Sequence, residues 1–387
     1  MDHHNFRGKN IPHIKMTPDV GIDDLVEIFA NSGYNARQLG EAAKLYGKMI
    51  KENATICLTI AGAMTPVGFG GIFKSLIERG FVDWVITTGA NVYHEEHFAW
   101  QLPVKQGHFE VDDNILYKKN IVRIRDVFIK GERTLMAQDK ILQQMCRKNF
   151  DKPFTTAEFC NLMGKHSKQK SIHPEKSFVV AAYDYDVPVY ISTLKDSSLA
   201  LDLVPLRLEN NVYRLDIVRE ILEQAAIVYS SKKSGIVEIG GGVPKNTAQQ
   251  TGPLLDQILG LGHGGQNYII QITDARPDTG GLSGATLQEG KSWGKVKDSH
   301  EDVIMVYADA TIAFPVLCLY ALSQEKPRKP QRLYKKLNQY YKNLAKPILA
   351  KSTRTCQIWL FQLLCLVLLL FSILCSALYT KQFFLNC

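Results

Sequence analysis

The sequence lacks two motifs that would identify a protein of this size at once. None of its eight cysteines forms a CxxC pair or joins a His/Cys cluster with zinc spacing, so we expect no metal site and no disulfide framework. No GxGxxG fingerprint stands between a predicted strand and a helix, which removes the standard sequence evidence for a dinucleotide. Residues 1–5 carry no apolar signal core, so we predict a cytoplasmic body with reduced thiols.

Acidic residues are absent from the last part of the chain. Eleven of the 46 Lys and Arg residues lie from Lys326 onward without any Asp or Glu, which leaves 35 basic against 38 acidic residues before Lys326. The formal charge of +8 therefore comes from the tail, and the body is mildly acidic. We expect no nucleic-acid partner for such a body, and a small cationic substrate suits it better.

The one long hydrophobic run is Ile358–Tyr379, which has 22 residues and no charge. A helix of that length spans a bilayer core, and the basic residues before it place the body on the cytoplasmic side. We therefore predict an N-terminal arm at 1–18, a globular body at 19–325, a basic juxtamembrane segment at 326–357 and a transmembrane helix at 358–379. A buried oligomerisation helix and a non-native extension are the alternatives for this run.

Short apolar runs alternate with amphipathic helical segments through the body. The strand candidates are Thr55–Ile60, Trp84–Thr88, Val189–Ser192, Gly235–Ile239, Tyr268–Thr273 and Val303–Ala308. This alternation predicts one large α/β domain with a Rossmann-like, doubly wound and mainly parallel sheet, followed by the C-terminal hydrophobic helix. In such sheets ligands bind at the carboxyl ends of the strands.

A carboxylate, an indole and a lysine stand within seven residues, at Glu289, Trp293 and Lys295. A lysine attacks an imine or carbonyl only when it is neutral, and an apolar pocket or a second cation lowers its pKa enough. Trp293 can supply the apolar wall, and its face attracts organic cations. In a helix Glu289 and Trp293 share a face, while Gly294 frees the backbone before Lys295. The alternative for this segment alone is an amphipathic surface turn.

Glycines and histidines give weaker signals. The triplet Gly240–Gly242 follows a predicted strand, where backbone N–H groups can approach a phosphate at a helix start, although a tight structural turn is equally compatible. Gly260–Gly265 lies before a strand, so we expect a loop there. His94 and His97 stand at i, i+3, which would suit a proton relay or a metal pair, but we expect a solvated helix face.

Five elements stand in order along the chain: Thr87–Asn91, Leu215–Val218, Gly240–Val243, the run from Ser283–Ala285 to Ser292–Lys295, and Val306–Ala310. Together they resemble the deoxyhypusine synthase family, and the resemblance covers roughly 19–322. The Ser-Trp-Gly-Lys element together with the downstream Tyr-Ala-Asp-Ala element is specific to this family.

This resemblance implies an NAD-dependent enzyme that transfers the aminobutyl group of spermidine, through a lysine imine, to an acceptor amine. Lys295 matches the imine-forming lysine, and the substrate-binding positions are Glu289, Trp293, Glu220 and Asn246. The cofactor-binding positions are Thr88, Gly89, Asp216, Gly241, Gly280, Ser283, Asp309 and Ala310. The resemblance also implies a homotetramer whose sites lie at subunit interfaces.

The chain departs from the family pattern at several positions. Where a histidine follows the glycine triplet in enzymes that modify protein, this chain has Lys245–Thr247, and Asn246 can orient a substrate but cannot relay protons. Leu282 replaces an acidic residue, and Tyr93–Glu96 replaces paired carboxylates. These changes resemble the bacterial deoxyhypusine synthase-like branch, so the acceptor is either a protein lysine or putrescine, as in homospermidine synthesis. A non-catalytic polyamine- or NAD-binding protein is the remaining alternative.

Overall fold

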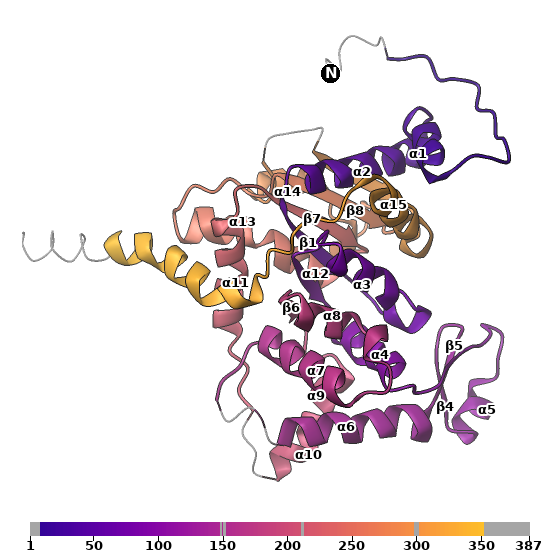
Figure 1. The fold of residues 1–387 in the computed structure, drawn as a ribbon, viewed down its shortest axis with the longest axis vertical. Helices are drawn as coiled ribbons and strands as arrows, with labels where there is room; N and C mark the ends of the chain where they lie inside the picture. Colours follow the sequence, from indigo (N-terminus) through magenta and orange to yellow (C-terminus); the bar gives the residue numbers. More distant parts are fainter. Residues whose placement is uncertain (1–7, 148, 150–151, 210–212, 298–301, 352–387) are drawn as a thin grey trace, which may run out of the picture. The chain divides into compact units, whose positions relative to one another are not determined.

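A six-stranded parallel sheet forms the centre of the protein, as seen in a computed structural model that describes residues 8–147, 149, 152–209, 213–297 and 302–351 (Figure 1). The strand order is β6-β2-β1-β7-β8-β9, and each neighbouring pair is parallel. Numbered by their appearance in this sheet, the strands follow the 3-2-1-4-5-6 order of the Rossmann fold. The predicted doubly wound parallel sheet is therefore confirmed. Its strands are β1 (Thr55–Ile60), β2 (Trp84–Thr87), β6 (Val189–Ile191), β7 (Ser234–Ile239), β8 (Tyr268–Thr273) and β9 (Val303–Tyr307).

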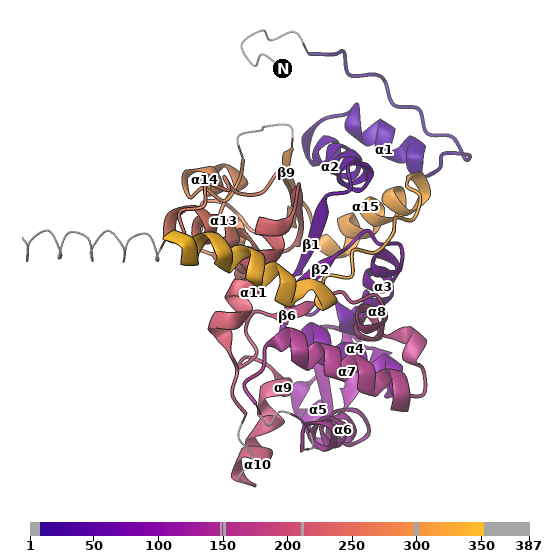
Figure 2. The same cartoon turned by 60° about the vertical axis from the view of Figure 1, so that its left-hand side comes forward.

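Helices cover both faces of the sheet (Figure 2). Five of the six strands are wholly buried, which accounts for their largely apolar sequences, and residues such as Ile56, Leu58 and Ile270 are fully buried. One layer contains α2 (Tyr34–Lys51), α3 (Gly70–Glu78) and α15 (Ala310–Gln324), and the other contains α11 (Ile217–Ser230), α12 (Gly242–Gln249) and α13 (Thr251–Pro253). The remaining α-helices are α1 (Ile22–Ala30), α4 (Gly89–Ala99), α5 (Asp113–Lys118), α6 (Met136–Arg147), α7 (Thr156–Lys170), α8 (Phe178–Asp184), α9 (Ser198–Leu201), α10 (Leu203–Leu208) and α14 (Leu287–Ser292).

A second, antiparallel sheet is inserted between α4 and α6, and the sequence did not predict it. Its order is β3-β5-β4, with β3 (Val104–Gln106), β4 (Ile121–Ile124) and β5 (Val127–Lys130). These strands have only three or four residues and are partly exposed. Such short segments carry too little period-two alternation to stand out from loops.

The prediction that His94 and His97 lie on a solvated helix face is wrong. His97 is fully buried in α4, and its Nδ1 lies 2.6 Å from Gln138 Oε1 while its Nε2 lies 3.0 Å from His94 Nδ1. Burial lowers the pKa of His94 to about 4 and that of His97 to about 3, so both rings are neutral near pH 7. The described residues contain no group of three or more His, Cys, Asp or Glu side chains placed to hold a metal ion.

The first part of the predicted basic segment 326–357 packs into the body. The chain divides into two units, Met1–Leu337 and Asn338–Cys387. In the first unit Arg328 pairs with the carboxylate of Asp83, which is only 2% exposed, and donates to Ala54 O at 2.7 Å. These contacts attach the segment to the amino-terminal ends of β1 and β2.

Replacing Arg328 with methionine should lower the free energy of unfolding by about 3 kcal/mol, because the substitution leaves a buried carboxylate without its cation. Burial already raises the pKa of Asp83 to about 6 against the opposing effect of Arg328. Without the guanidinium this pKa rises further, so the folded variant takes up a proton at a higher pH than the wild type, and its deficit should shrink as the pH falls toward 6 and level off below 6. Urea unfolding at several pH values measures this, with exposed Lys329→Met as the control. Equal stability of both variants at pH 8 would contradict the expectation.

The predicted transmembrane helix at 358–379 lies outside the described residues. Within the residues that the structure does describe, no helix is both long and apolar enough to cross a membrane. The described residues of the second unit, 338–351, are helical. In the body, the four described cysteines are buried and free.

Candidate active site

A helix-terminating turn determines where Lys295 lies. At the end of α14, the N–H of Gly294 donates to Lys291 O and the N–H of Lys295 donates to Gly290 O, both at 3.0 Å. These two bonds, with Gly294 at a φ of 68° in the left-handed region, form a Schellman motif. The motif reverses the chain and returns Lys295 beside the helix that it ends.

Close packing fixes the main chain of Lys295 after this turn. A Cβ added to Gly265 would lie 2.6 Å from the carbonyl carbon of Lys295, and one added to Gly252 would lie 2.6 Å from Gly294 O. The N–H of Gln266 donates to Lys295 O at 3.0 Å. Two glycines and one hydrogen bond therefore hold the lysine backbone, and its side chain is the part that remains free to react.

A cavity of about 270 Å³ lies at the side chain of Lys295. It brings together Lys295, Glu289, Trp293 and Asn246, four of the residues predicted from the sequence. Lys295 Nζ donates to Asn246 Oδ1 at 2.8 Å and lies 5.8 Å from the centroid of the Trp293 ring. Trp293 is 62% exposed, so the cavity is open on the indole side. The other lining residues are Lys245, Gln249, Gln250, Leu282, Ala285, Thr286 and Gly290.

The surroundings of Lys295 favour its neutral amine. Burial lowers the pKa of this half-buried lysine, while the carboxylates of Glu238 and Glu289 act in the opposite direction. Because desolvation penalises the charged form, the ammonium is less stable here than on the surface. This environment thus shifts Lys295 toward the neutral form, which is the form that can attack an electrophilic carbon.

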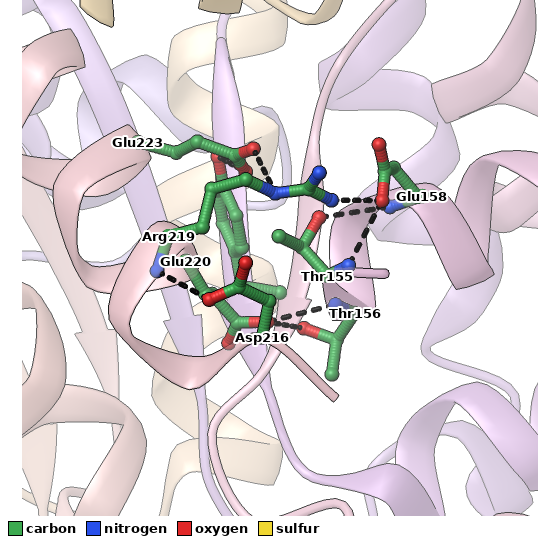
Figure 3. A network of polar contacts seen from close by, with 8 residues as sticks. Thr155, Thr156, Glu158, Asp216, Arg219, Glu220 and Glu223 are labelled. Carbon is green, nitrogen blue, oxygen red and sulfur yellow. Dashed lines mark hydrogen bonds and ion pairs between the residues drawn. The ribbon is translucent and has the colours of Figure 1, made fainter. Parts of the chain in front are cut away.

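A second cavity, of about 500 Å³, adjoins the first, because Asn246 and Gln250 line both. It contains Glu220, the remaining predicted substrate-binding residue. Glu220 Oε2 accepts from Thr156 N at 2.7 Å and from Thr156 Oγ1 at 2.6 Å, as Figure 3 shows. Burial raises the pKa of this carboxyl against these hydrogen bonds. An ammonium group in the second cavity would find its counter-charge on Glu220.

The predicted cofactor residue Asp216 lies apart from these cavities. Its Oδ1 accepts from Arg219 N at 3.0 Å and caps α11, one turn before Glu220 (Figure 3). The Arg219 guanidinium in turn lies between Glu158 and Glu223. Asp216 lines neither of the two cavities, so its part in the network is to start the helix that carries Glu220.

The other predicted cofactor positions gather at the carboxyl edge of the parallel sheet. Thr88 follows β2, caps α4 and donates from Oγ1 to Gly62 O at 2.6 Å. Asp309 follows β9 and caps α15 through Thr311 N at 2.6 Å. The remaining positions are Gly89 at the start of α4, Gly241 after β7, Gly280 and Ser283 after β8, and Ala310 at the start of α15. Ligands of Rossmann-type sheets bind along this edge.

Gly241 forms the closest backbone approach of this edge. A Cβ at Gly241 would lie 2.5 Å from Ser283 Cα, and Gly240 and Gly242 have φ values of 72° and 59°. Gly241 therefore leaves no room for a side chain directly before α12. A phosphate group fits such a helix start, because the main-chain N–H groups can reach it. On this observation the residues present fit a dinucleotide despite the missing fingerprint.

Sequence reasoning missed several residues of the site. Asn91 connects the ends of β1 and β2, because its Oδ1 accepts from Met64 N at 2.7 Å and its Nδ2 donates to Gly62 O at 3.2 Å. Lys245 was considered only as part of the segment that replaces the family histidine, yet it lines the cavity of Lys295. Glu238 was also missed, although one charged residue inside an apolar strand is a visible signal.

The half-buried Lys295 and its cavity lie beside a parallel sheet in Rossmann order, which is an architecture of α/β enzymes. The chain belongs to the deoxyhypusine synthase family, because the family profile described as "Deoxyhypusine synthase" matches residues 24–321. A "Deoxyhypusine synthase-like protein" from a Nostoc species is 39% identical over 354 residues, which are 89% of this chain and 92% of the relative.

Two further comparisons agree with this membership. A protein from Archaeoglobus fulgidus named "Probable deoxyhypusine synthase 1" is 36% identical over 305 residues, covering 79% of this chain and 95% of the relative. The crystal structure of an Entamoeba histolytica protein provisionally named a deoxyhypusine synthase superposes with a TM-score of 0.55 at 16% identity. It covers 80% of this chain and 96% of that one, and this likeness supports the fold alone.

Proposed function

We propose that the protein transfers the aminobutyl group of spermidine, by way of an imine on Lys295, to an acceptor amine. The observation that carries this proposal is the cavity in which Lys295 lies with Glu289, Trp293 and Asn246. A carboxylate binds an ammonium group, and an indole face packs on methylene groups or a cation. The cavity thus offers separate places for the charge of a polyamine, its carbon chain and its reacting carbon.

The residues of the chain divide the chemistry between them. NAD, when bound against Thr88, Gly241, Ser283 and Asp309, would accept a hydride from spermidine and return it at the end, so that it is not consumed. Lys295 Nζ then forms a bond to the oxidised carbon, while the bond from that carbon to the departing nitrogen breaks and 1,3-diaminopropane leaves as the amine. The acceptor amine displaces Lys295 in the same way. Asn246, which already accepts from Nζ, orients the lysine for both steps.

The second cavity supports a small diamine such as putrescine as the acceptor. Its one carboxylate, Glu220, is held by Thr156, and it faces a chamber shared with the Lys295 cavity through Asn246 and Gln250. A protein lysine is the alternative acceptor.

Exposed apolar residues near the rim, Ile217, Ile258 and Trp293, support the proposal that a second subunit of a homotetramer covers the site. A cytoplasmic body and a membrane anchor at 358–379 remain predictions.

Incubation of the full-length protein with spermidine and NAD should release 1,3-diaminopropane, which chromatography after amine derivatisation measures. Adding putrescine should give homospermidine, whereas a hypusine-type translation factor should gain an aminobutyl group if the acceptor is a protein lysine. Mass spectrometry separates these two products. Binding of spermidine without release of 1,3-diaminopropane would refute the transferase and favour a polyamine-binding protein.

A further inference from the structure

Thr156 connects three elements of the protein beside the second cavity, the one of about 500 Å³ that contains Glu220. It is the first residue of α7 and is fully buried. Its Oγ1 accepts from Ile191 N, at the end of β6, at 2.8 Å and donates to Glu220 Oε2, in the first turn of α11, at 2.6 Å. A main-chain N–H can only donate, so the hydrogen of this hydroxyl is directed to the carboxylate.

The main chain brings the start of α7 to Glu220. The N–H of Phe154 donates to Arg214 O at 2.9 Å, and the N–H of Asp216 donates to Phe154 O at 2.8 Å, so the segments before α7 and α11 run side by side. The first N–H groups of a helix have no partner within the helix. Thr156 N accordingly donates to Glu220 Oε2 at 2.7 Å (Figure 3). One carboxylate oxygen thus receives two hydrogen bonds from a single residue.

The other oxygen of this carboxylate is left for a ligand. Among the described residues, only Thr156 forms hydrogen bonds with the Glu220 side chain, and both bonds reach Oε2. Glu220 is also the only charged residue among the described residues that line the second cavity. The neighbouring guanidinium of Arg219 is paired with Glu158 and Glu223 instead. The carboxylate is therefore available as the counter-charge of an ammonium group that enters the cavity.

We propose that Thr156 is a positioning residue of the acceptor site: it holds Glu220 in one rotamer, with Oε2 anchored, so that Oε1 binds the remote ammonium group of a diamine acceptor. The inference rests on the proposed function, in which the acceptor amine enters the second cavity. The other nitrogen of the diamine, as a neutral amine, then lies toward Asn246, which lines both cavities. Because both contacts of Thr156 with Oε2 come from donors, they favour the ionised form of the carboxyl.

The other titratable groups near Glu220 are Arg219 and Glu223 on α11, Glu158 and Cys160 on α7, and Tyr190 on β6. Burial raises the pKa values of the Cys160 thiol and the Tyr190 phenol, so both groups are neutral. Burial also raises the pKa of Glu220, and the two hydrogen bonds from Thr156 oppose this shift, as does the charge of Arg219. Removing the Thr156 hydroxyl should therefore raise the pKa of Glu220 further.

The test is calorimetric titration of the full-length protein with putrescine across a pH series. Thr156→Val keeps the shape of the side chain but removes its hydroxyl, so the dissociation constant should rise about tenfold near neutral pH. A carboxyl with a raised pKa is protonated at a higher pH and then no longer binds an ammonium, so the midpoint at which affinity is lost on acidification should move up by about one pH unit. Thr156→Ser keeps the hydroxyl and should bind nearly as the wild type does. Glu220→Gln identifies the part of the binding that depends on this carboxylate.

Thr155→Val is the matched control. Thr155 is also fully buried, and its hydroxyl accepts from Glu158 N at the start of α7 but forms no hydrogen bond with Glu220 among the described residues. Its loss should lower the thermal midpoint without changing the affinity for putrescine or its pH dependence. This difference separates positioning of the carboxylate from general stability.

Three results would overturn the inference: putrescine binding that does not depend on Glu220, an unchanged pH dependence in Thr156→Val, or an equal loss in Thr156→Ser. Thr156→Ala provides a second variant without the hydroxyl if the valine variant does not fold, as judged by near-UV circular dichroism. The 1,3-diaminopropane assay is separate. Weakened, pH-shifted putrescine binding by Thr156→Val, in a protein whose wild type does not cleave spermidine, would refute the proposed function and leave the role of Thr156 standing.

Discussion

Replacing Lys295 with alanine should lower the release of 1,3-diaminopropane from spermidine by about a thousandfold or more, the scale of loss when a covalent nucleophile is removed. Lys295→Arg should fail equally, although it keeps a positive charge and a long side chain. A guanidinium stays protonated at any working pH and cannot attack carbon. Comparing the two variants separates nucleophilicity from simple charge or packing.

Lys297 provides the matched control for this experiment. It stands two residues further along the same segment but lines neither cavity. Lys297→Ala should therefore keep nearly the whole rate. Substantial release of 1,3-diaminopropane by Lys295→Ala, or an equal loss in Lys297→Ala, would remove Lys295 from its proposed role.

Gly241→Ala should weaken NAD binding and lower the rate by about a hundredfold, the scale expected when a reacting group is displaced by about 1 Å. The added Cβ would lie 2.5 Å from Ser283 Cα, so the loop after β8 must move away from the glycine triplet before α12. Calorimetric titration with NAD and the initial rate with spermidine measure the two effects.

Gly71→Ala is the control for the glycine substitution, because a Cβ there meets no atom within 4 Å and Gly71 is neither a predicted cofactor position nor a lining residue of either cavity. Its NAD affinity and rate should match those of the wild type, and its thermal midpoint shows the general effect of an added methyl group. Unchanged NAD affinity in Gly241→Ala would contradict the proposal that NAD binds at this turn.

The parallel sheet could be predicted because its signal is local. Thr55–Ile60 and Tyr268–Thr273 are apolar runs that match β1 and β8 residue for residue. The burial of His94 and His97 could not be predicted in this way, because their polar side chains indicate a surface helix. Their burial depends on α6, which supplies Gln138 as a hydrogen-bond partner more than forty residues away in the chain.

The residues of the site also fall into two groups, those that are close in the sequence and those that only the fold brings together. Glu289, Trp293 and Lys295 stand within seven residues, so one helix and its terminal turn are enough to bring them together. Lys245 and Asn246 share a cavity with Lys295 only because α12 packs beside the turn after α14, and no local pattern encodes that packing. The sequence could therefore indicate the lysine, while the other residues that line its cavity required the fold.

The most direct measurement of the central claim is the site of the covalent intermediate. The wild-type protein should be incubated with spermidine and NAD, reduced with borohydride and digested for peptide mass spectrometry. We predict one aminobutyl group on Lys295 and none on Lys245, Lys291 or Lys297. Release of 1,3-diaminopropane with an unmodified Lys295, or with the group on another lysine, would contradict this account of the site.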